Sequence, residues 1–549
     1  MNALYVADGA PPSLPGITEA APTLDWWLLA PILVVFGAGV LAVLFEAFLP
    51  KKVLRPVQIT VAAVALLVTF VMIVLQVEAV GDGVIVAGGV LAVDRVVLFL
   101  QGTITVLALI SLMLIAERRD GRDAFSAQAA TVPGSEEERR HILAGSQHTE
   151  VYPLVLFAVL GMLLFPAAND FLTMFIALEV MSLPLYLLCG LARRRRLFSQ
   201  EAAVKYFLLG AFSSAFFLFG IALVYGYAGS VNFTAIRQAV DSGGAAIFAD
   251  GNGEPLLVMG IGLVAIGLLF KVGAVPFHNW KPDVYQGAPT PITALMASCT
   301  LVAAFGALLR VFFVPFGGSL EVWEPMLWTV AILTMVAAAV VAVTQRDIKR
   351  LLAYSSVVHA GFILTAVIAS STEGLVGAMF YLAAYGFTTL GAFAIVTLVR
   401  TRDGGQELGD LEGWAGLGRR APGLALALSL FLLAFAGIPL TSGFIGKFAV
   451  FQAAVAAGAT PLVVVGVLSS AVTAFFYIRI IVVMFFRESE GEGPTVARAG
   501  ALTGGVITVG VAATLALGIF PGPVLDNLLP GSEAGQEPAA VMVHQVTEE

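Results

Sequence analysis

Cysteine and charge are both scarce in this sequence. Only two cysteines occur, Cys189 and Cys299, and both lie inside apolar runs. We therefore expect no disulfide framework, zinc site or iron–sulfur cluster in this chain, and interpret both as small core residues. Charged residues make up only 12% of the chain, and no basic cluster is interleaved with aromatics. The composition therefore predicts no nucleic-acid partner.

Motifs of soluble enzymes are also missing. No nucleophile motif, phosphate-binding loop or metal-ligand spacing stands out, and glycine runs such as GVLAVLFE are typical of close helix packing. The N-terminal stretch MNALYVADGAPPSLPG lacks a basic region followed by a short apolar core, so a cleaved signal peptide is not expected. We expect the first apolar helix itself to direct the chain to a membrane.

Long hydrophobic runs dominate the chain instead. Of its 549 residues 59% are hydrophobic, and the mean hydropathy is +0.94. Because about 20 apolar residues cross the hydrocarbon of a bilayer, the sequence predicts an all-α polytopic membrane protein with about fourteen helices. The predicted spans are 25–49, 57–79, 94–116, 151–168, 170–192, 202–228, 256–278, 291–315, 325–344, 348–370, 374–400, 421–457 (interrupted), 462–486 and 499–522.

The distribution of basic residues predicts the orientation. Short cytoplasmic loops carry an excess of Lys and Arg. With both termini outside, the outer loops keep only Arg95 and Arg237, so the bias is about tenfold. The inner loops then hold Lys51, Lys52, Arg55, Arg118, Arg119, Arg122, Arg139, Arg140, Arg193 to Arg196, Lys281, Arg346, Lys349, Arg350, Arg400, Arg402, Arg419, Arg420, Arg487 and Arg498.

Two predicted spans are interrupted in a similar way. The seventh places Lys271 before Pro276, and the twelfth places Pro439 before Lys447 with glycines between them. Paired interrupted helices indicate inverted repeats with ion sites at mid-membrane. We therefore divide the chain into 1–150 (three helices and a polar loop), 151–316 and 317–488 (two inverted five-helix repeats), and 489–549 (the last helix and a polar tail). GDGVIVAGGVLAVDR predicts a short strand pair with an Ala-Gly-Gly turn.

Five ionisable residues lie at membrane depth. They are Glu179, Lys205, Lys271, His359 and Lys447. A charge at the bilayer centre costs about 2.5–3.5 kcal/mol, so such residues face water, a partner or another helix. A buried lysine has a lowered pKa that a nearby carboxylate raises again, and histidine titrates close to neutral pH. The series therefore predicts a proton relay.

Structural interpretations stand beside several of these assignments. Lys205 lies near enough to its span end to snorkel to the headgroups instead. His278 is a further relay candidate, but it can equally cap its helix, and His359 can equally be a hydrogen-bonded packing residue. We expect four charged residues near span ends to snorkel: Glu46, Asp94, Arg310 and Arg479.

Several motifs resemble the antiporter-like subunits of proton-pumping NADH:quinone oxidoreductase, respiratory complex I. They are LEVMSLPLYLL, EAAVKYFLLGAFSSAFFLFGIALVYGYAGS, FKVGAVPFHNWKPDVYQGAPTPI, DIKRLLAYSSVVHAGFIL and GIPLTSGFIGKF. Among the three related subunits, VYQGAPTPI and the LE that opens the fifth-span motif are most similar to subunit N. The resemblance implies fourteen helices, two inverted repeats and broken seventh and twelfth helices.

The resemblance also implies roles for residues and partners. Glu179 and Lys271 would form a coupled pair, His359 would lie on a central polar axis, and Lys447 would open toward the exit side. Protons would be transported across a bacterial cell membrane when quinone is reduced elsewhere in the complex. Other membrane-arm subunits would be partners, and partner subunits would hold FMN, the iron–sulfur clusters and quinone, with no cofactor in this chain.

One position departs from the pattern of these subunits. The eighth helix usually carries a lysine where ASCTLVAAFG has Leu301. The lateral link from the seventh helix to the twelfth then lacks its middle titratable group, although Ser298, Cys299 and Thr300 offer polar groups nearby. One alternative is therefore a scaffold of the membrane arm that no longer transports. Another is a subunit of a multi-subunit cation/proton antiporter, which shares the lysines and the glutamate.

Overall fold

The structure is a computed structural model that describes residues 24–81, 83–118, 123–125, 135–137, 140, 149–244, 253–401, 406–488, 494–529 and 538–542. Most of the polar loop expected between Glu117 and Glu150, and most of the polar tail after Gly531, lie outside these residues. Of the expected inner-loop arginines, Arg119, Arg122, Arg139 and Arg402 also lie outside them.

Helices make up nearly all of the described chain. The first half contains α1 (Trp26–Phe48), α2 (Lys51–Gln76), α3 (Arg95–Ala116), α5 (Val151–Leu164), α6 (Phe171–Cys189), α7 (Arg196–Ala228), α8 (Phe233–Ser242), α9 (Glu254–Val272), α10 (Trp280–Gly287), α11 (Thr290–Leu295) and α12 (Leu301–Phe313). The second half contains α13 (Leu320–Thr344), α14 (Ile348–Ile368), α15 (Thr372–Val396), α16 (Leu417–Arg420), α17 (Pro422–Ala436), α18 (Ser442–Ala456), α19 (Thr460–Phe486), α20 (Ala501–Ile519), α21 (Gly522–Leu528) and α22 (Pro538–Met542).

Twelve helices of the described chain are long and apolar enough to span a membrane. The fourth predicted span is the shorter α5, which a 3₁₀ turn extends to Ala167, and the twelfth is split into α17 and α18. The all-α polytopic fold is thus confirmed, whereas the total of fourteen spans and the two repeats stay predictions. One boundary differs clearly, since α7 begins at Arg196 rather than at residue 202.

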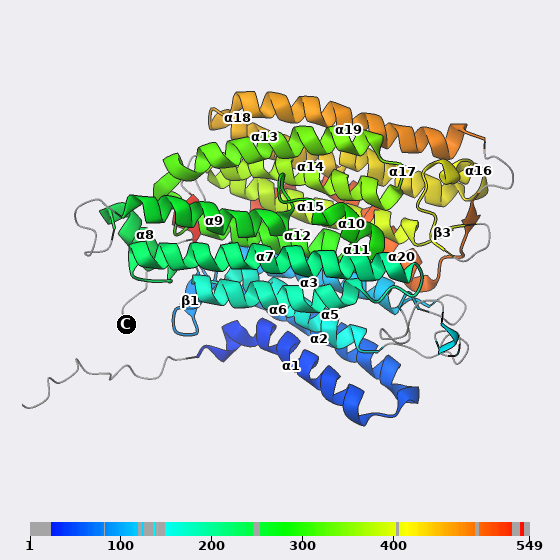
Figure 1. Cartoon of the computed structure of the whole chain (residues 1–549), viewed down its shortest axis with the longest axis horizontal. Helices are drawn as coiled ribbons and strands as arrows, with labels where there is room; N and C mark the ends of the chain where they lie inside the picture. The colour runs from blue at the N-terminus through cyan, green and yellow to red at the C-terminus, as the bar shows by residue number, and fades with distance from the viewer. Residues whose placement is uncertain are drawn as a thin grey trace, which may run out of the picture.

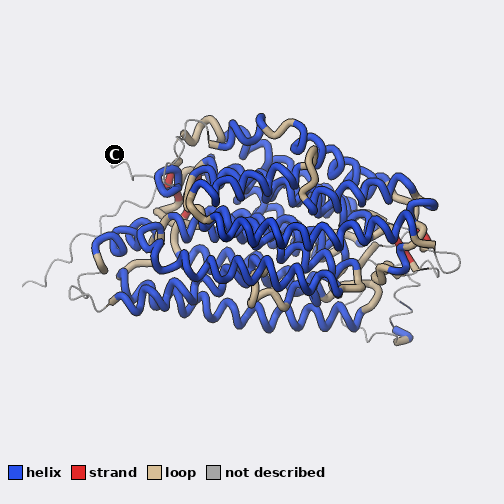
Figure 2. Tube along the Cα trace, turned by 90° about the horizontal axis from the view of Figure 1, so that it is seen from above, coloured by secondary structure: helices blue, strands red, loops and turns tan. Residues whose placement is uncertain are grey.

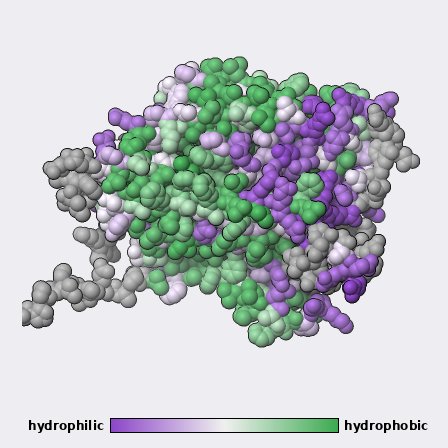
Figure 3. Space-filling view, viewed as in Figure 1, coloured by the Kyte–Doolittle hydropathy of each residue, from purple (hydrophilic) through white to green (hydrophobic). Residues whose placement is uncertain are grey.

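The long helices lie side by side and run along one common direction (Figure 1). The helical segment Thr290–Phe313 and helices α14 and α15 are almost wholly buried and form the centre of the bundle. By contrast, α1, α2, α7 and α19 expose many large apolar side chains. These side chains contribute to the apolar surface in Figure 3, which suits contact with lipid or apolar neighbours.

Short strand pairs lie at opposite ends of the bundle (Figure 2). The predicted hairpin is confirmed: β1 (Val84–Val86) pairs antiparallel with β2 (Leu91–Val93). Its turn residues Ala87, Gly88 and Gly89 all have positive φ, which explains the two glycines. At the other end, β3 (Val399–Arg400) pairs with β4 (Thr495–Val496) near the basic loops.

Helices α7 and α9 approach each other closely because two glycines meet. A Cβ on Gly220 would lie 2.7 Å from the backbone nitrogen of Val264, and a Cβ on Gly260 would lie 3.1 Å from that of Val224. Small residues allow this kind of backbone contact in membranes. The contact matters for the site below, because α7 carries Ser214 and α9 carries Lys271.

The prediction that Arg310 and Asp94 snorkel to the headgroups is wrong. Both side chains are buried and form an ion pair with each other. Arg310 also donates to the carbonyl of Pro166 at 3.0 Å, and Asp94 caps α3 by accepting from Val97 N at 2.7 Å. The pair joins residues 216 positions apart, so no local sequence signal could indicate it. For Glu46 and Arg479, both half-buried, snorkelling stays a prediction.

Candidate functional site

Glu179 and Lys271 belong to one polar cluster between α6, α7 and α9. Ser214 Oγ donates to Glu179 Oε1 at 2.5 Å, so α7 orients the carboxylate of α6. Glu179 also interacts electrostatically with Lys271. The hydroxyl of Ser182, one turn after Glu179, donates to the carbonyl of Leu178.

Lys271 is 4% exposed, and its Nζ has no hydrogen-bond partner among the described residues. The rings of Tyr206 and Tyr186 lie 5.2 and 5.6 Å from Nζ, within the range of cation–π attraction. Lys271 also lies in the last turn of α9, where the helix dipole favours a positive charge. The ammonium of Lys271 therefore interacts with two rings, the end of α9 and Glu179, rather than with a hydrogen-bond acceptor of the described chain.

The seventh span is broken immediately after Lys271, as predicted, although the helix ends at Val272 rather than near residue 278. Gly273 has a φ of 77° and its N–H donates to the carbonyls of Leu269 and Phe270. Trp280 Nε1 donates to the carbonyl of Phe270 as well, at 2.9 Å. The backbone freed by the break is therefore satisfied within the protein, which is the condition for irregular backbone at membrane depth.

The twelfth span is broken at Gly437, between α17 and α18. Lys447 of α18 reaches back to the end of α17, where its Nζ donates to the carbonyls of Phe435 and Ala436 at 2.9 and 3.0 Å. It donates further to Ser470 Oγ at 2.8 Å. Carbonyls at the C-terminal end of a half-helix are a cation site in transporters of this architecture.

His359 occupies the centre of the bundle, on α14. Its Nδ1 lies 2.6 Å from the hydroxyl of Tyr381 and its Nε2 lies 3.2 Å from that of Tyr477. The hydroxyl of Tyr477 is also bonded to Ser355. The ring of Phe435, whose carbonyl accepts from Lys447, packs 5.5 Å from the imidazole. His359 is thus both hydrogen-bonded and next to the Lys447 site.

Two other candidates, Lys205 and Thr300, lie outside the site formed by Glu179 and Lys271 and outside the site formed by His359 and Lys447. Lys205 has a side chain 42% exposed and pairs with Glu201 and Asp283, each at 2.7 Å. Asp283 also pairs with Arg350 at 2.6 Å, so Lys205 belongs to a partly exposed ion network that joins α7, α10 and α14. Thr300 donates to the carbonyl of Met296 at 2.5 Å, within its own helix.

His278 lies in the irregular segment between α9 and α10. Its side chain is half-buried, its ring packs 6.1 Å from that of Tyr354, and its Nδ1 has no hydrogen-bond partner among the described residues.

Leu301 is buried and directly follows a π-helical turn, Met296–Thr300. Such turns are frequent at functional sites. For His278, Thr300 and Lys205, a role in proton transfer stays a prediction.

Two kinds of functional candidate were missed from the sequence. Lys281 was assigned to an inner loop, but it is 1% exposed and its Nζ donates to Ser356 Oγ at 3.0 Å. The excess of Lys and Arg in the predicted inner loops could not distinguish Lys281 from loop lysines. Its position in the second half of a broken helix could have indicated that it is buried. The buried tyrosines Tyr186, Tyr206, Tyr285, Tyr381, Tyr385 and Tyr477 were also missed, since aromatics in apolar runs are typical of packing.

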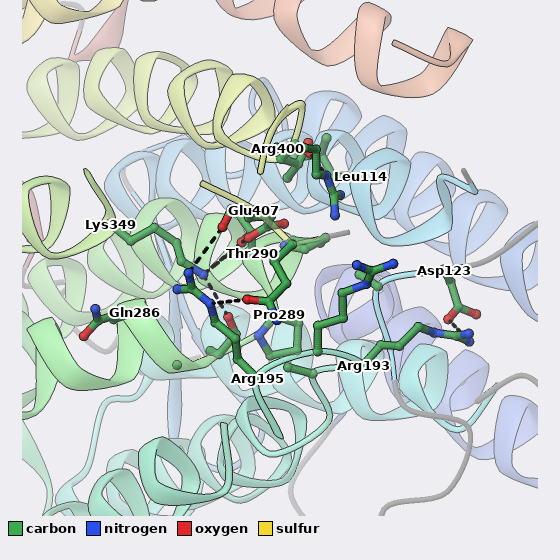
Figure 4. A pocket seen from close by; sticks show the side chains of 18 of the residues that line it. Leu114, Asp123, Arg193, Arg195, Gln286, Pro289, Thr290, Lys349, Arg400 and Glu407 are labelled. Carbon is green, nitrogen blue, oxygen red and sulfur yellow. Dashed lines mark hydrogen bonds and ion pairs between the residues drawn. The ribbon is translucent and has the colours of Figure 1, made fainter. Parts of the chain in front are cut away.

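A cavity of about 200 Å³ lies at the basic end of the bundle. Figure 4 shows Arg193, Arg195, Lys349 and Glu407 around it. Lys349 Nζ donates to Thr290 Oγ1 at 3.1 Å and lies 3.5 Å from Glu407 Oε2. Because Thr290 begins α11, this polar cavity reaches the end of the central buried helices.

This geometry defines a class of protein. An antiporter-like membrane subunit has these features: two broken spans, each with a lysine at the break, a carboxylate beside Lys271, and a histidine next to the Lys447 site. The family model described as "NADH:quinone oxidoreductase/Mrp antiporter, TM" matches residues 168–473. The chain belongs to this family, and within it to the NADH-quinone oxidoreductase subunit N proteins.

Individual relatives support this assignment. NADH-quinone oxidoreductase subunit N of Thermobifida fusca is 70% identical over 97% of both chains, and that of Mycobacterium tuberculosis H37Rv is 53% identical over 92% of this chain and 97% of the relative. A chain of respiratory complex I from Thermus thermophilus is 32% identical, with a TM-score of 0.72 over 91% of this chain and 99% of that one.

A chain of the Mrp complex from Dietzia sp. has a similar fold. Its TM-score is 0.73, over 94% of this chain and 96% of that one, but it is only 22% identical. This match carries information on the fold alone. The alternative of a multi-subunit cation/proton antiporter is therefore supported less well than membership of the subunit N proteins.

Proposed function

We propose that this chain is a proton-translocating subunit of the membrane arm of a bacterial NADH-quinone oxidoreductase. Protons cross the membrane through its interior when quinone is reduced elsewhere in the complex, so the chain acts as part of a translocase. The observation that carries the proposal is the polar row formed by half-buried Glu179 and buried Lys271, His359 and Lys447, on helices α6, α9, α14 and α18.

The protein groups in this row do the chemistry of proton transfer. Lysine and histidine bind and release protons, whereas arginine stays charged. Glu179 stabilises the charged form of Lys271, and movement of that carboxylate or of water would favour release. At the other end, the carbonyls of Phe435 and Ala436 stabilise the charged form of Lys447.

The remaining assignments follow from this proposal. The basic end, with the cavity in Figure 4, faces the cytoplasm and takes up protons, and both termini lie outside. Other membrane-arm subunits cover part of the exposed apolar surface, and lipid covers the rest. FMN, the iron–sulfur clusters and quinone belong to partner subunits, and Glu179, Lys271, His359 and Lys447 hold protons rather than a cofactor.

We expect Lys447→Met in the assembled complex to lower NADH-driven proton pumping about tenfold or more, because a positioned proton-transfer group contributes about 10²–10⁴-fold. Pumping is measured in membrane vesicles with a pH-sensitive dye, and NADH oxidation by ferricyanide in the same vesicles reports assembly. Lys52→Met, at an exposed position in α2, is the matched control. Pumping at the control level with normal assembly would contradict the proposal.

A further inference from the structure

Lys281 lies on α10, between the cluster of Glu179 and Lys271 and the cluster of His359 and Lys447. Helix α10 packs against α7, which carries Ser214, and against α14, which carries His359. The side chain is 1% exposed and its Nζ donates to Ser356 Oγ at 3.0 Å. An ammonium buried this deeply is a functional candidate by the same reasoning that applies to Lys271.

The surroundings of Lys281 repeat those of Lys447. Gly273 and Gly437 each end a half-helix with positive φ, 77° and 82°. In both, the glycine N–H donates to the carbonyls three and four residues earlier, and the next N–H donates to the carbonyl five residues earlier. A Cβ on Gly273 would lie 2.9 Å from Lys281 Nζ, and a Cβ on Gly437 would lie 3.3 Å from Lys447 Nζ.

Both lysines therefore fold back from the second half-helix over the end of the first. There the end of the helix dipole carries a partial negative charge that favours a cation. Each lysine also donates to a serine hydroxyl, Lys281 to Ser356 and Lys447 to Ser470. The two breaks thus hold two lysines in similar positions, and Lys271 is an additional one.

Polar groups lead from Lys281 toward His359. The Ser356 side chain lies close to the hydroxyls of Tyr285 and Tyr385. The ring of Tyr385 packs 4.9 Å from the imidazole of His359. Ser356 also lies one turn before His359 on α14, next to Ser355, which bonds to Tyr477.

We propose that Lys281 is a proton carrier between the Glu179–Lys271 cluster and the His359–Lys447 cluster. This inference rests on the proposed function and adds to it the group that makes the lateral link at the place where Leu301 provides none. A proton leaves the ammonium of Lys281 and binds Ser356 Oγ, while the proton of that hydroxyl moves on toward His359. Neutral Lys281 then binds the next proton from the Lys271 side, so only N–H and O–H bonds change.

The test uses Lys281→Met and Lys281→Arg in the assembled complex, with Lys52→Met as control. We expect both Lys281 variants to lower NADH-driven pumping about tenfold or more, since arginine keeps the charge but holds its proton. An arginine variant that pumps normally would show that Lys281 serves only as a fixed charge. Adding Leu301→Lys to Lys281→Met places a lysine on the neighbouring central helix and is expected to restore pumping at least in part.

The outcomes separate this inference from the proposed function. Pumping at the control level in both Lys281 variants, together with loss of pumping in Lys447→Met, would overturn the role of Lys281 alone. Control-level pumping in the Lys447 variant as well would overturn the proposed function. If Lys281→Met fails to assemble, Ser356→Ala serves as the test, because it keeps the lysine and removes its hydrogen-bond acceptor. Loss of pumping in this variant would support the role of Lys281, and normal pumping would overturn it.

Discussion

An assembled complex that carries Lys271→Met in this subunit is expected to pump protons about tenfold more slowly or worse. Methionine is unbranched and apolar, so it fills the space between Tyr186 and Tyr206 without offering a proton site. Replacing the buried charge also removes the group that Glu179 acts on. A positioned group of this kind contributes about 10²–10⁴-fold to a proton-transfer step.

The companion variant Lys271→Arg separates charge from proton exchange. Arginine keeps the positive charge next to the tyrosine rings and the end of α9 but does not release its proton. We therefore expect it to fail as Lys271→Met does. Both are measured as NADH-driven dye quenching in vesicles, normalised to ferricyanide reduction. An arginine variant that pumps normally would show that Lys271 serves only as a fixed charge.

The second large effect concerns stability. We expect Arg310→Met to destabilise the protein by about 3–5 kcal/mol, because it leaves the carboxylate of Asp94 buried without its counter-charge. The carbonyl of Pro166 also loses a donor. Thermal unfolding of the detergent-solubilised complex, followed by intrinsic fluorescence, measures the loss, and a native gel reports the fraction that assembles.

A control variant and a double variant distinguish loss of the buried ion pair from loss of any arginine. Arg95→Met, at the start of α3, removes an arginine that donates to Gly81 at a surface position and should change stability by about 0.5 kcal/mol or less. The double variant Arg310→Met with Asp94→Asn removes both charges and keeps an oxygen that can cap α3, so it should recover much of the loss. A single Arg310 variant as stable as the Arg95 variant would contradict the buried-pair interpretation.

The spans, the broken helices and the hairpin could be predicted because each depends on local sequence. Apolar length determines a span, and Pro276 and Pro439 with their neighbouring glycines interrupt one. Ala87-Gly88-Gly89 supplies the positive φ values of the turn. The depth of Lys271 and Lys447 also follows from hydropathy, so the amino-acid sequence alone is enough to name both as candidates.

The partners of these groups could not be predicted, because they come from distant parts of the chain. Asp94 with Arg310 and Ser214 with Glu179 are tertiary contacts that hydropathy does not encode. Lys281 was placed in a loop because a short polar helix after a break has the composition of a loop. Its burial depends on α10 folding back between α7 and α14.

The central claim, that protons pass through the interior of this chain, is tested most directly by a high-resolution electron-microscopy map of the assembled complex that resolves ordered water. We expect water in contact with Lys271, Lys281 and Lys447, joined through Ser356 and His359 and open toward the basic cavity at Thr290 and Lys349. Lysine side chains sealed in dry apolar packing, with no water path to either end of the bundle, would contradict it.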